Sequence, residues 1–234
     1  MPRPLWLSLW GDASGGELQM MISASLPDVS DHDLAVAVRV IKEGGVVAFP
    51  TETYYGLAVD SFNSKALARL FEIKQRPLSK AVLVLVQDQK QLPQLVEQVP
   101  AVFVPLLDQF WPGPLTLVFP AQDRVSPLLT GGTGTVGVRV SSHPVAARLL
   151  FSAGIPLTAT SANISGQEPA TSAAQVKTQF GDAVDCIIDG GETPGGKGST
   201  LIGCGADGRC LLLRDGVVPF SSIEAVIGVN LPLK

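Results

Sequence analysis

The feature that most constrains the fold is an alternation of short apolar runs with segments of helical periodicity. Predominantly apolar runs occur at residues 46–49, 81–86, 115–119, 135–140, 155–160 and 186–188. Such runs are typical of strands buried inside a sheet. Between them the apolar spacing predicts helices near 31–43, 65–74, 88–110 (broken by prolines), 144–153, 171–180 and 221–226. The pattern predicts a single α/β domain, a mixed sheet flanked by helices, and the density of strands in the last third of the chain suggests some antiparallel pairing.

Composition and charge exclude several classes of protein. The 234 residues are 46% hydrophobic and 16% charged, which suits one domain with a sizeable core and argues against disorder. A net charge of −4 excludes a strongly basic protein that coats nucleic acid, although it allows a local basic patch. No apolar run reaches the ~18–20 residues that cross a bilayer, so we expect no membrane association.

The cysteines and histidines predict neither a zinc site nor a disulfide framework. Cys186, Cys204 and Cys210 contain no CxxC spacing, and His32 and His143 lie far from them in sequence. A cytoplasmic, reducing environment is therefore expected.

The first candidate for ligand binding is the polar loop after the strand at 46–49. Thr51, Glu52 and Thr53 offer groups for a small polar substrate at a strand end, or they form a turn held by hydroxyl-to-backbone hydrogen bonds. Tyr54 and Tyr55 follow, and they are equally consistent with a wall for a flat ring and with core packing.

Isolated cations form the second set of candidates. Lys74 and Arg76 either complement a helix dipole or clamp a phosphate, and Lys80 could contribute to such a clamp. Arg139 interrupts an apolar strand, so it faces solvent at an edge or requires an anion inside the protein. Arg214 is either an anion partner or a surface charge at a strand end.

Two loops complete the candidates. The segment 161–166 (SANISG) offers hydroxyl and amide groups after a strand, although it is also an ordinary turn. The segment 191–200 is close to a P-loop, but Gly198 stands where Ser or Thr is required and a strand follows instead of a helix. Its glycines, with Ser199 and Thr200, could still hold a phosphate or an amino acid. No Ser-His-Asp arrangement is recognisable.

The order of these segments resembles the Sua5/YciO/YrdC family over residues 30–228. The resemblance rests on the segments 49–57 (FPTETYYGL), 74–77 (KQRP), 110–116 (FWPGPLT), 138–140 (VRV), 143–144 (HP), 161–166 (SANISG), 198–200 (GST) and 213–216 (LRDG). It implies a YrdC-like domain at 30–228 with a concave, positively charged face. An extension at 1–29 without an assigned role and a tail at 229–234 flank that domain.

The resemblance implies the activity of a threonylcarbamoyl-adenylate synthase. Such a nucleotidyltransferase combines L-threonine, bicarbonate and ATP, with Mg²⁺, into threonylcarbamoyl-AMP and pyrophosphate. A partner complex then transfers the threonylcarbamoyl group to adenosine 37 of tRNA, so transient contact with that complex and with tRNA is implied.

The resemblance also implies roles for individual residues. Catalysis would rest on positioning and charge neutralisation by Lys74, Arg76 and Arg139. L-Threonine would be bound by Thr51, Tyr55, Arg139 and Ser199. ATP would be bound by Lys74, Arg76, Thr135, Ser161, Asn163 and Arg214. No side chain is assigned to a metal. Lys74→Ala or Arg76→Ala is expected to abolish pyrophosphate release and leave the fold intact.

The sequence departs from the family pattern at two positions, and the resemblance also allows a function other than catalysis. Leu85 stands where many members carry a histidine, and Gly198 stands where a glutamate is usual. The alternative is a non-catalytic, RNA-binding or ribosome-associated module like a YciO paralogue. It predicts a clustered basic face whose possible members are Lys74, Arg76, Lys80, Arg139 and Arg148.

Overall fold

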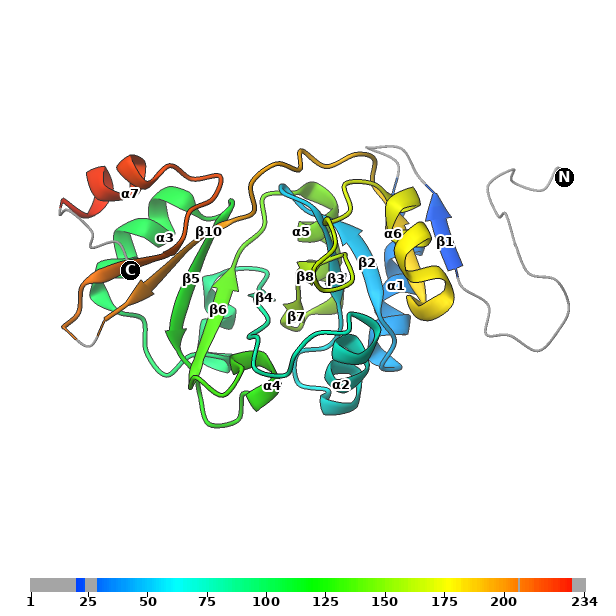
Figure 1. Cartoon of the computed structure of the whole chain (residues 1–234), viewed down its shortest axis with the longest axis horizontal. Helices are drawn as coiled ribbons and strands as arrows, with labels where there is room; N and C mark the ends of the chain where they lie inside the picture. Colours follow the sequence, from blue (N-terminus) through cyan, green and yellow to red (C-terminus); the bar gives the residue numbers. More distant parts are fainter. Residues whose placement is uncertain (1–19, 24–28, 206, 229–234) are drawn as a thin grey trace, which may run out of the picture.

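The computed structural model describes residues 20–23, 29–205 and 207–228, and it confirms the mixed α/β fold. The strands form two mixed sheets rather than the single sheet predicted (Figure 1). The first sheet has the order β1-β9-β2-β3-β8, and its strands are β1 Met20–Ser23, β9 Cys186–Asp189, β2 Val47–Pro50, β3 Tyr55–Ala58 and β8 Thr160–Ser161. The second has the order β11-β10-β5-β6-β4-β7, and its strands are β11 Cys210–Arg214, β10 Thr200–Cys204, β5 Leu115–Pro120, β6 Thr135–Arg139, β4 Val84–Leu85 and β7 Leu157–Thr158.

Five of the described α-helices begin at a capping side chain, from Ser30, Asn63, Ser126, His143 or Ser172, and α4, α5, α6 and α7 end at glycine. The α-helices are α1 Asp31–Lys42, α2 Ser64–Ile73, α3 Val104–Phe110, α4 Pro127–Thr130, α5 Pro144–Ala153, α6 Ala173–Phe180 and α7 Phe220–Ile227. Ser30 caps α1 in a capping box, accepting from the backbone N–H of Asp33 at 3.2 Å while the Asp33 carboxylate accepts from the Ser30 N–H at 3.0 Å. The predicted helix at 88–110 is instead two 3₁₀ turns, η1 Gln89–Gln94 and η2 Ala101–Phe103, followed by α3, because proline cannot occupy a helix interior without breaking it. The 3₁₀ turn η3 Gly181–Ala183 follows α6.

The strand predicted at 155–160 is divided between the two sheets. Its first part, β7, pairs with β4 in the second sheet, and its last part, β8, pairs with β3 in the first. The strand predicted at 81–86 is likewise reduced to the two residues of β4. The chain therefore passes from one sheet to the other near Ala159, and it joins them at that point.

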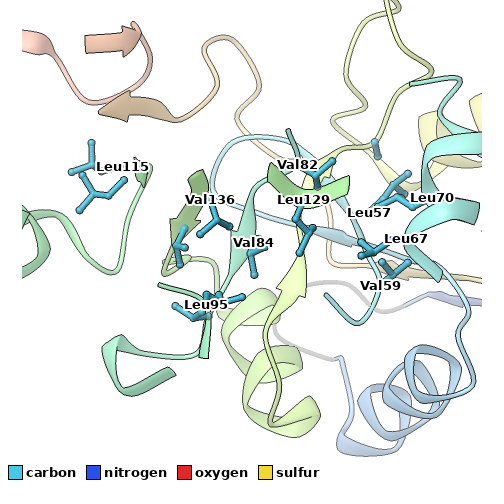
Figure 2. Close-up of a cluster of buried hydrophobic side chains, with 14 of the residues drawn as sticks. Leu57, Val59, Leu67, Leu70, Val82, Val84, Leu95, Leu115, Leu129 and Val136 are labelled. Carbon is cyan, nitrogen blue, oxygen red and sulfur yellow. The ribbon is translucent and has the colours of Figure 1, made fainter. Parts of the chain in front are cut away.

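One continuous core connects the two sheets. Buried side chains extend from β3 and α2 to the second sheet, and Figure 2 labels among them Leu57, Val59, Leu67, Leu70, Val82, Val84, Leu129 and Val136. A second apolar cluster includes residues of α1, α5 and the first sheet. Leu85, at the position of the family's histidine, is fully buried in this second cluster.

β1 lies at the edge of the first sheet, where it pairs in parallel with β9. It comes from the segment predicted to be an extension; residues 1–19 and 24–28, and the predicted tail at 229–234, lie outside the described residues. Within the described part of the chain, no helix is both long and apolar enough to cross a membrane.

Candidate functional site

A pocket of about 470 Å³ opens where the two sheets meet. The crossover between the sheets contributes to it through Ala159 and through Thr160 and Ser161 of β8. The lining contains most of the predicted site residues, namely Thr51, Tyr55, Arg76, Thr135, Arg139, Ser161, Ser199 and Arg214. Lys74 and Asn163 are not in the lining.

Three arginines from different elements line this pocket. Arg76 follows α2 and is braced by donating to the carbonyl of Ala81 at 2.7 Å. Arg214 ends β11, and its Nη2 donates to the carbonyl and hydroxyl of Ser199 at 2.8 and 3.1 Å. Burial lowers the pKa of both guanidinium groups, and Arg139 lowers that of Arg214 further. Neighbouring cations in a partly desolvated pocket favour an anionic ligand.

Arg139, at the end of β6, is buried. Of the two alternatives, an edge position facing solvent and an interior position that needs an anion, the structure therefore shows the second. Arg139 is 3% exposed, and its Nη1 lies 3.4 Å from Oε1 of Glu52. Among the described residues, Arg139 Nε has no hydrogen-bond partner and neither does Glu52 Oε1. Burial lowers the pKa of Arg139, and Glu52 opposes that shift. The guanidinium is therefore held by one carboxylate and retains an unused donor.

Glu52, which the sequence places in the polar loop at 51–53 without a role of its own, is the charged neighbour of Arg139. Its carboxylate accepts from the hydroxyl of Ser141, which in turn accepts from the backbone N–H of His143 at 3.2 Å. Burial lowers the pKa of His143, while Glu52 opposes the shift. The available signal was the position of Glu52 in a polar loop after a buried strand; its pairing with Arg139 joins residues far apart in the chain.

Lys74 lies under the pocket instead of lining it as a phosphate clamp. It is 1% exposed, and its Nζ donates to the carbonyls of Ser161 at 2.5 Å and Asn163 at 2.6 Å. Burial, with a smaller contribution from Arg76, lowers its pKa to about 7. Lys74 therefore holds the turn at 161–163 in place, and its predicted direct contact with ATP is not supported by this geometry.

The end of α2 explains why Lys74 and Arg76 take different directions. Arg76 N–H donates to Phe71 O and Gln75 N–H donates to Glu72 O, each at 2.9 Å, which is the Schellman pattern. Gln75 has φ of 48°, in the left-handed region. The reversal of the chain at Gln75 leaves Lys74 on the buried side and brings Arg76 to the pocket.

Asn163 braces the same turn from within. Its Oδ1 accepts from the Ser161 hydroxyl at 2.6 Å, and its Nδ2 donates to the carbonyls of Ile164 and Gln167 at 3.0 and 2.8 Å. These contacts occupy its amide and hold the turn in shape, and of these two residues only Ser161 lines the pocket.

Thr51 and Tyr55, both predicted to contact substrate, are buried residues whose hydroxyls make hydrogen bonds within the protein. Thr51 donates to Tyr54 O at 2.7 Å, the turn-type bond that was one of its two alternatives. Tyr55 is fully buried, and its hydroxyl donates to Gly191 O at 2.8 Å and accepts from Gly190 N–H at 3.2 Å. Burial and Asp189 raise the pKa of Tyr55. Tyr55 therefore fixes the glycine-rich loop, and a free aromatic wall at this position is excluded.

Hydroxyls and a rim ion pair complete the pocket. The Oγ atoms of Ser199 and Thr116 are 2.8 Å apart. At the rim, Lys197 pairs with Asp215 at 2.5 Å. A Cβ on Gly198 would lie 3.4 Å from Nη2 of Arg214, so a glutamate at this position would face that arginine. Because residue 198 is glycine, it supplies no carboxylate to pair with the Arg214 guanidinium.

Gly216, in the loop after β11, touches the backbone of residues 198–200 before and at the start of β10. This close approach gives a first testable prediction. A Cβ there would lie 2.4 Å from Thr200 N and 2.5 Å from Gly198 O, both backbone atoms that cannot yield. We expect Gly216→Ala to lower the free energy of unfolding by about 2–4 kcal/mol in urea denaturation. Gly198→Ala is the control, because its Cβ makes only an ordinary contact. Equal losses in the two variants would contradict the close-approach argument.

The fold and site define an α/β protein with an arginine-lined pocket at the junction of two mixed sheets. The family model described as "Telomere recombination", of the Sua5, YciO and YrdC proteins, matches residues 39–216. The chain therefore belongs to the Sua5/YciO/YrdC family.

Individual relatives agree with this assignment. A threonylcarbamoyl-AMP synthase of Pyrococcus abyssi is 41% identical over 200 residues, which cover 86% of this chain and 58% of that protein. The crystal structure of P. abyssi Sua5 complexed with L-threonine superposes with a TM-score of 0.88 at 38% identity, covering 92% of this chain and 63% of that one. The crystal structure of E. coli YciO superposes with a TM-score of 0.76 at 26% identity, covering 86% of this chain and 97% of that one. The chain thus spans well under two thirds of the length of the P. abyssi synthase.

Proposed function

We propose that this protein is an enzyme that makes threonylcarbamoyl-AMP and pyrophosphate from L-threonine, bicarbonate and ATP. The observation that carries the proposal is the convergence of Arg76, Arg139 and Arg214 on one hydroxyl-rich pocket. ATP, bicarbonate and the carboxylate of threonine are all anions, which such a pocket suits. A relative named as this synthase and a solved structure complexed with L-threonine, both from P. abyssi, support the same choice.

The chemistry needs positioning and charge neutralisation more than a nucleophilic side chain. The threonine amine adds to bicarbonate with loss of water, and a carbamate oxygen then attacks the α-phosphorus and expels pyrophosphate. Arg139, which lines the pocket beside Glu52, is the proposed partner of a carboxylate or carbamate. Arg76 and Arg214 are the proposed partners of the phosphates, where developing charge is stabilised.

Hydroxyls and bracing residues have supporting roles in this proposal. Thr51, Thr135, Ser161 and Ser199 line the pocket and offer hydrogen bonds to threonine and to the nucleotide. Lys74 acts as a positioning residue, because its contacts hold the turn that presents Ser161.

Mg²⁺ fits this pocket as a companion of the nucleotide. Among the described residues no group of three or more His, Cys, Asp or Glu side chains is arranged to hold a metal ion. Magnesium commonly keeps several waters and binds largely through substrate phosphates, where it neutralises charge. The oxygen atoms of side chains that line the pocket are mostly hydroxyls, and the Asp215 carboxylate is paired with Lys197. Mg²⁺ would therefore be held mainly through the nucleotide phosphates.

The test is the reaction itself. Purified protein is incubated with L-threonine, bicarbonate, ATP and Mg²⁺, and threonylcarbamoyl-AMP and pyrophosphate are followed by mass spectrometry. We expect product that depends on threonine and on bicarbonate. Absence of product from folded protein that still binds ATP would contradict the proposal. If product forms, its transfer to tRNA by a partner complex is the next expectation.

The alternative of a non-catalytic RNA-binding module is favoured only by the likeness to YciO. The five cations suggested for a basic face are not gathered on one surface. Lys74 is buried, and Arg148 pairs with Asp31 at 2.8 Å and donates to Val29 O, away from the pocket lining. Only Arg76 and Arg139 of the five line the pocket, which supports a small anionic ligand over an RNA backbone.

Arg76 provides a second prediction with a matched control. Arg76→Ala should raise the KM for ATP by about 10–100-fold and also lower kcat, so that pyrophosphate release is largely lost. The thermal midpoint should not change, because the lost group is half-buried and contacts only nearby carbonyls. Lys80→Ala removes an exposed cation four residues away that is not in the lining and should leave KM unchanged. Equal effects of the two substitutions would indicate a general charge effect and remove Arg76 from the phosphate site.

A further inference from the structure

We propose that Cys204 and Cys210 are a site of reversible thiol oxidation, where a disulfide forms across the β10–β11 hairpin. The two residues are directly opposite each other in the antiparallel register of these strands. Both are free thiols in the structure. Neither residue has a role in the proposed synthase reaction, so this inference is independent of it.

The hydrogen-bond pattern shows that this pair has the closer of the two possible spacings. Gly205 N–H donates to Arg209 O at 2.8 Å, so the next pair along the hairpin is hydrogen-bonded. Because bonded and non-bonded pairs alternate in an antiparallel ladder, Cys204 and Cys210 form a non-bonded pair. In such pairs the Cα atoms are about 4.5 Å apart, within the range of about 4.4–6.8 Å that disulfides span.

The two side chains also lie on the same face of the hairpin. Cys210 is buried in the main core, and Cys204 packs against that core while remaining partly exposed. The thiol of Cys204 currently donates to the carbonyl of Gly205 at 3.5 Å, a weak contact that a rotation about the Cα–Cβ bond would replace. Forming the disulfide therefore needs a change of side-chain rotamer rather than a new strand register.

The chemistry is two successive thiol–disulfide exchanges with a low-molecular-weight disulfide such as oxidised glutathione. The partly exposed Cys204 attacks as a thiolate, forms a mixed disulfide and releases one glutathione thiol. Cys210 then attacks the Cys204 sulfur and releases the second glutathione thiol. The protein loses two electrons and two protons, and one glutathione disulfide becomes two thiols.

The environment sets the rate of this exchange. Burial raises the pKa of the Cys210 thiol to about 11 and also raises that of Cys204. Few thiolates are therefore present at neutral pH, so the exchange is slow there and accelerates as the pH rises. This predicts a stable pair of thiols under reducing conditions and a crosslink under sustained oxidation.

The crosslink would stiffen a hairpin that belongs to the pocket. β11 ends at Arg214, and residue Leu201 of β10 is opposite Arg214 in the register. Both of these residues line the pocket. A covalent link at Cys204 and Cys210 fixes the register from the other end of the same two strands, and it opposes any separation of the strands.

Trypsin provides a direct test, because Arg209 separates the two cysteines. The full chain is incubated with oxidised glutathione at alkaline pH, blocked with N-ethylmaleimide, denatured and digested. Cleavage after Lys197, Arg209 and Arg214 yields peptides 198–209 and 210–214. We expect these two peptides joined by a disulfide in the oxidised sample and separately alkylated in a sample treated with dithiothreitol. The oxidised protein should also have a thermal midpoint higher by roughly 2–6 °C.

The controls distinguish this pair from other thiol chemistry. Cys186 is fully buried in β9, so Cys186→Ser should retain the crosslink, while Cys204→Ser should abolish it. Glutathione adducts without a crosslink, a crosslink that includes Cys186, or a disulfide between two chains on a non-reducing gel would each overturn the proposal. The unmodified chain carries the decisive measurement, so no outcome depends on a variant that fails to fold.

Discussion

Arg139→Met is expected to abolish threonine-dependent pyrophosphate release, with a loss of about 100-fold or more, and also to destabilise the protein. The activity falls because the buried guanidinium is the proposed partner of a carboxylate or carbamate in the pocket. The stability falls because Glu52 loses the cation 3.4 Å from its Oε1. Removing one member of a buried pair costs about 3–5 kcal/mol, and the 13% exposure of the Glu52 side chain reduces this to about 2–3 kcal/mol.

A double variant separates these two effects. Glu52→Gln together with Arg139→Met removes both charges, so we expect urea denaturation to recover most of the lost stability. Activity should stay absent, because the pocket still lacks its guanidinium. Recovery of pyrophosphate release in the double variant would show that Arg139 acts only through the fold. Glu52→Gln alone, which keeps the guanidinium, should retain measurable activity and lose affinity for threonine.

Lys74→Met is expected to give a stability change that depends strongly on pH. The folded-state pKa of Lys74 is about 7, below its ordinary value of 10.5, because burial disfavours the ammonium. Between these two values the unfolded chain binds more protons at Lys74 than the folded protein, so the contribution of Lys74 to the free energy of unfolding rises with pH. It is least favourable below pH 7 and reaches its full value only above the unfolded-state pKa of 10.5.

The measurement is the difference in unfolding free energy between the unaltered chain and Lys74→Met at pH 6 and pH 10. We expect this difference to be larger at pH 10 by about 3–4 kcal/mol, because a neutral amine donates to both carbonyls without the cost of a buried charge. Cysteine and tyrosine ionisations are common to both chains and cancel. Lys80→Met, at an exposed position, should show no such pH dependence. A difference that is independent of pH would rule out a buried, titrating Lys74.

The same substitution should reduce activity at every pH. Without Nζ the carbonyls of Ser161 and Asn163 lose their shared donor, and the Ser161 side chain in the pocket loses its fixed position. This revises the expectation that Lys74 could be replaced with the fold intact. The contrast with Arg76 follows from the left-handed turn at Gln75, which the pattern Lys-x-Arg does not reveal.

Local sequence determined the elements whose causes are local. The cap at Ser30, the apolar stripe of α1, the strand after Gly45 and the glycine-rich loop before Ser199 all follow from neighbouring residues, and the structure confirms them. The same holds for the antiparallel hairpin of β10 and β11. Co-linear motifs also indicated most of the residues that line the pocket, because most of the motifs lie at the ends of strands or helices, where the loops begin.

Only the tertiary structure decided what each polar group does. It divided the run at 155–160 between two sheets, because its halves find different partner strands. It gave Arg139 its counter-ion in Glu52, and it buried Lys74 under a turn formed some ninety residues later in the chain. A polar side chain can be buried only where partners satisfy it, and those partners came from distant parts of the chain. Sequence therefore determined which groups were available, and packing determined which of them face a ligand and which hold the others in place.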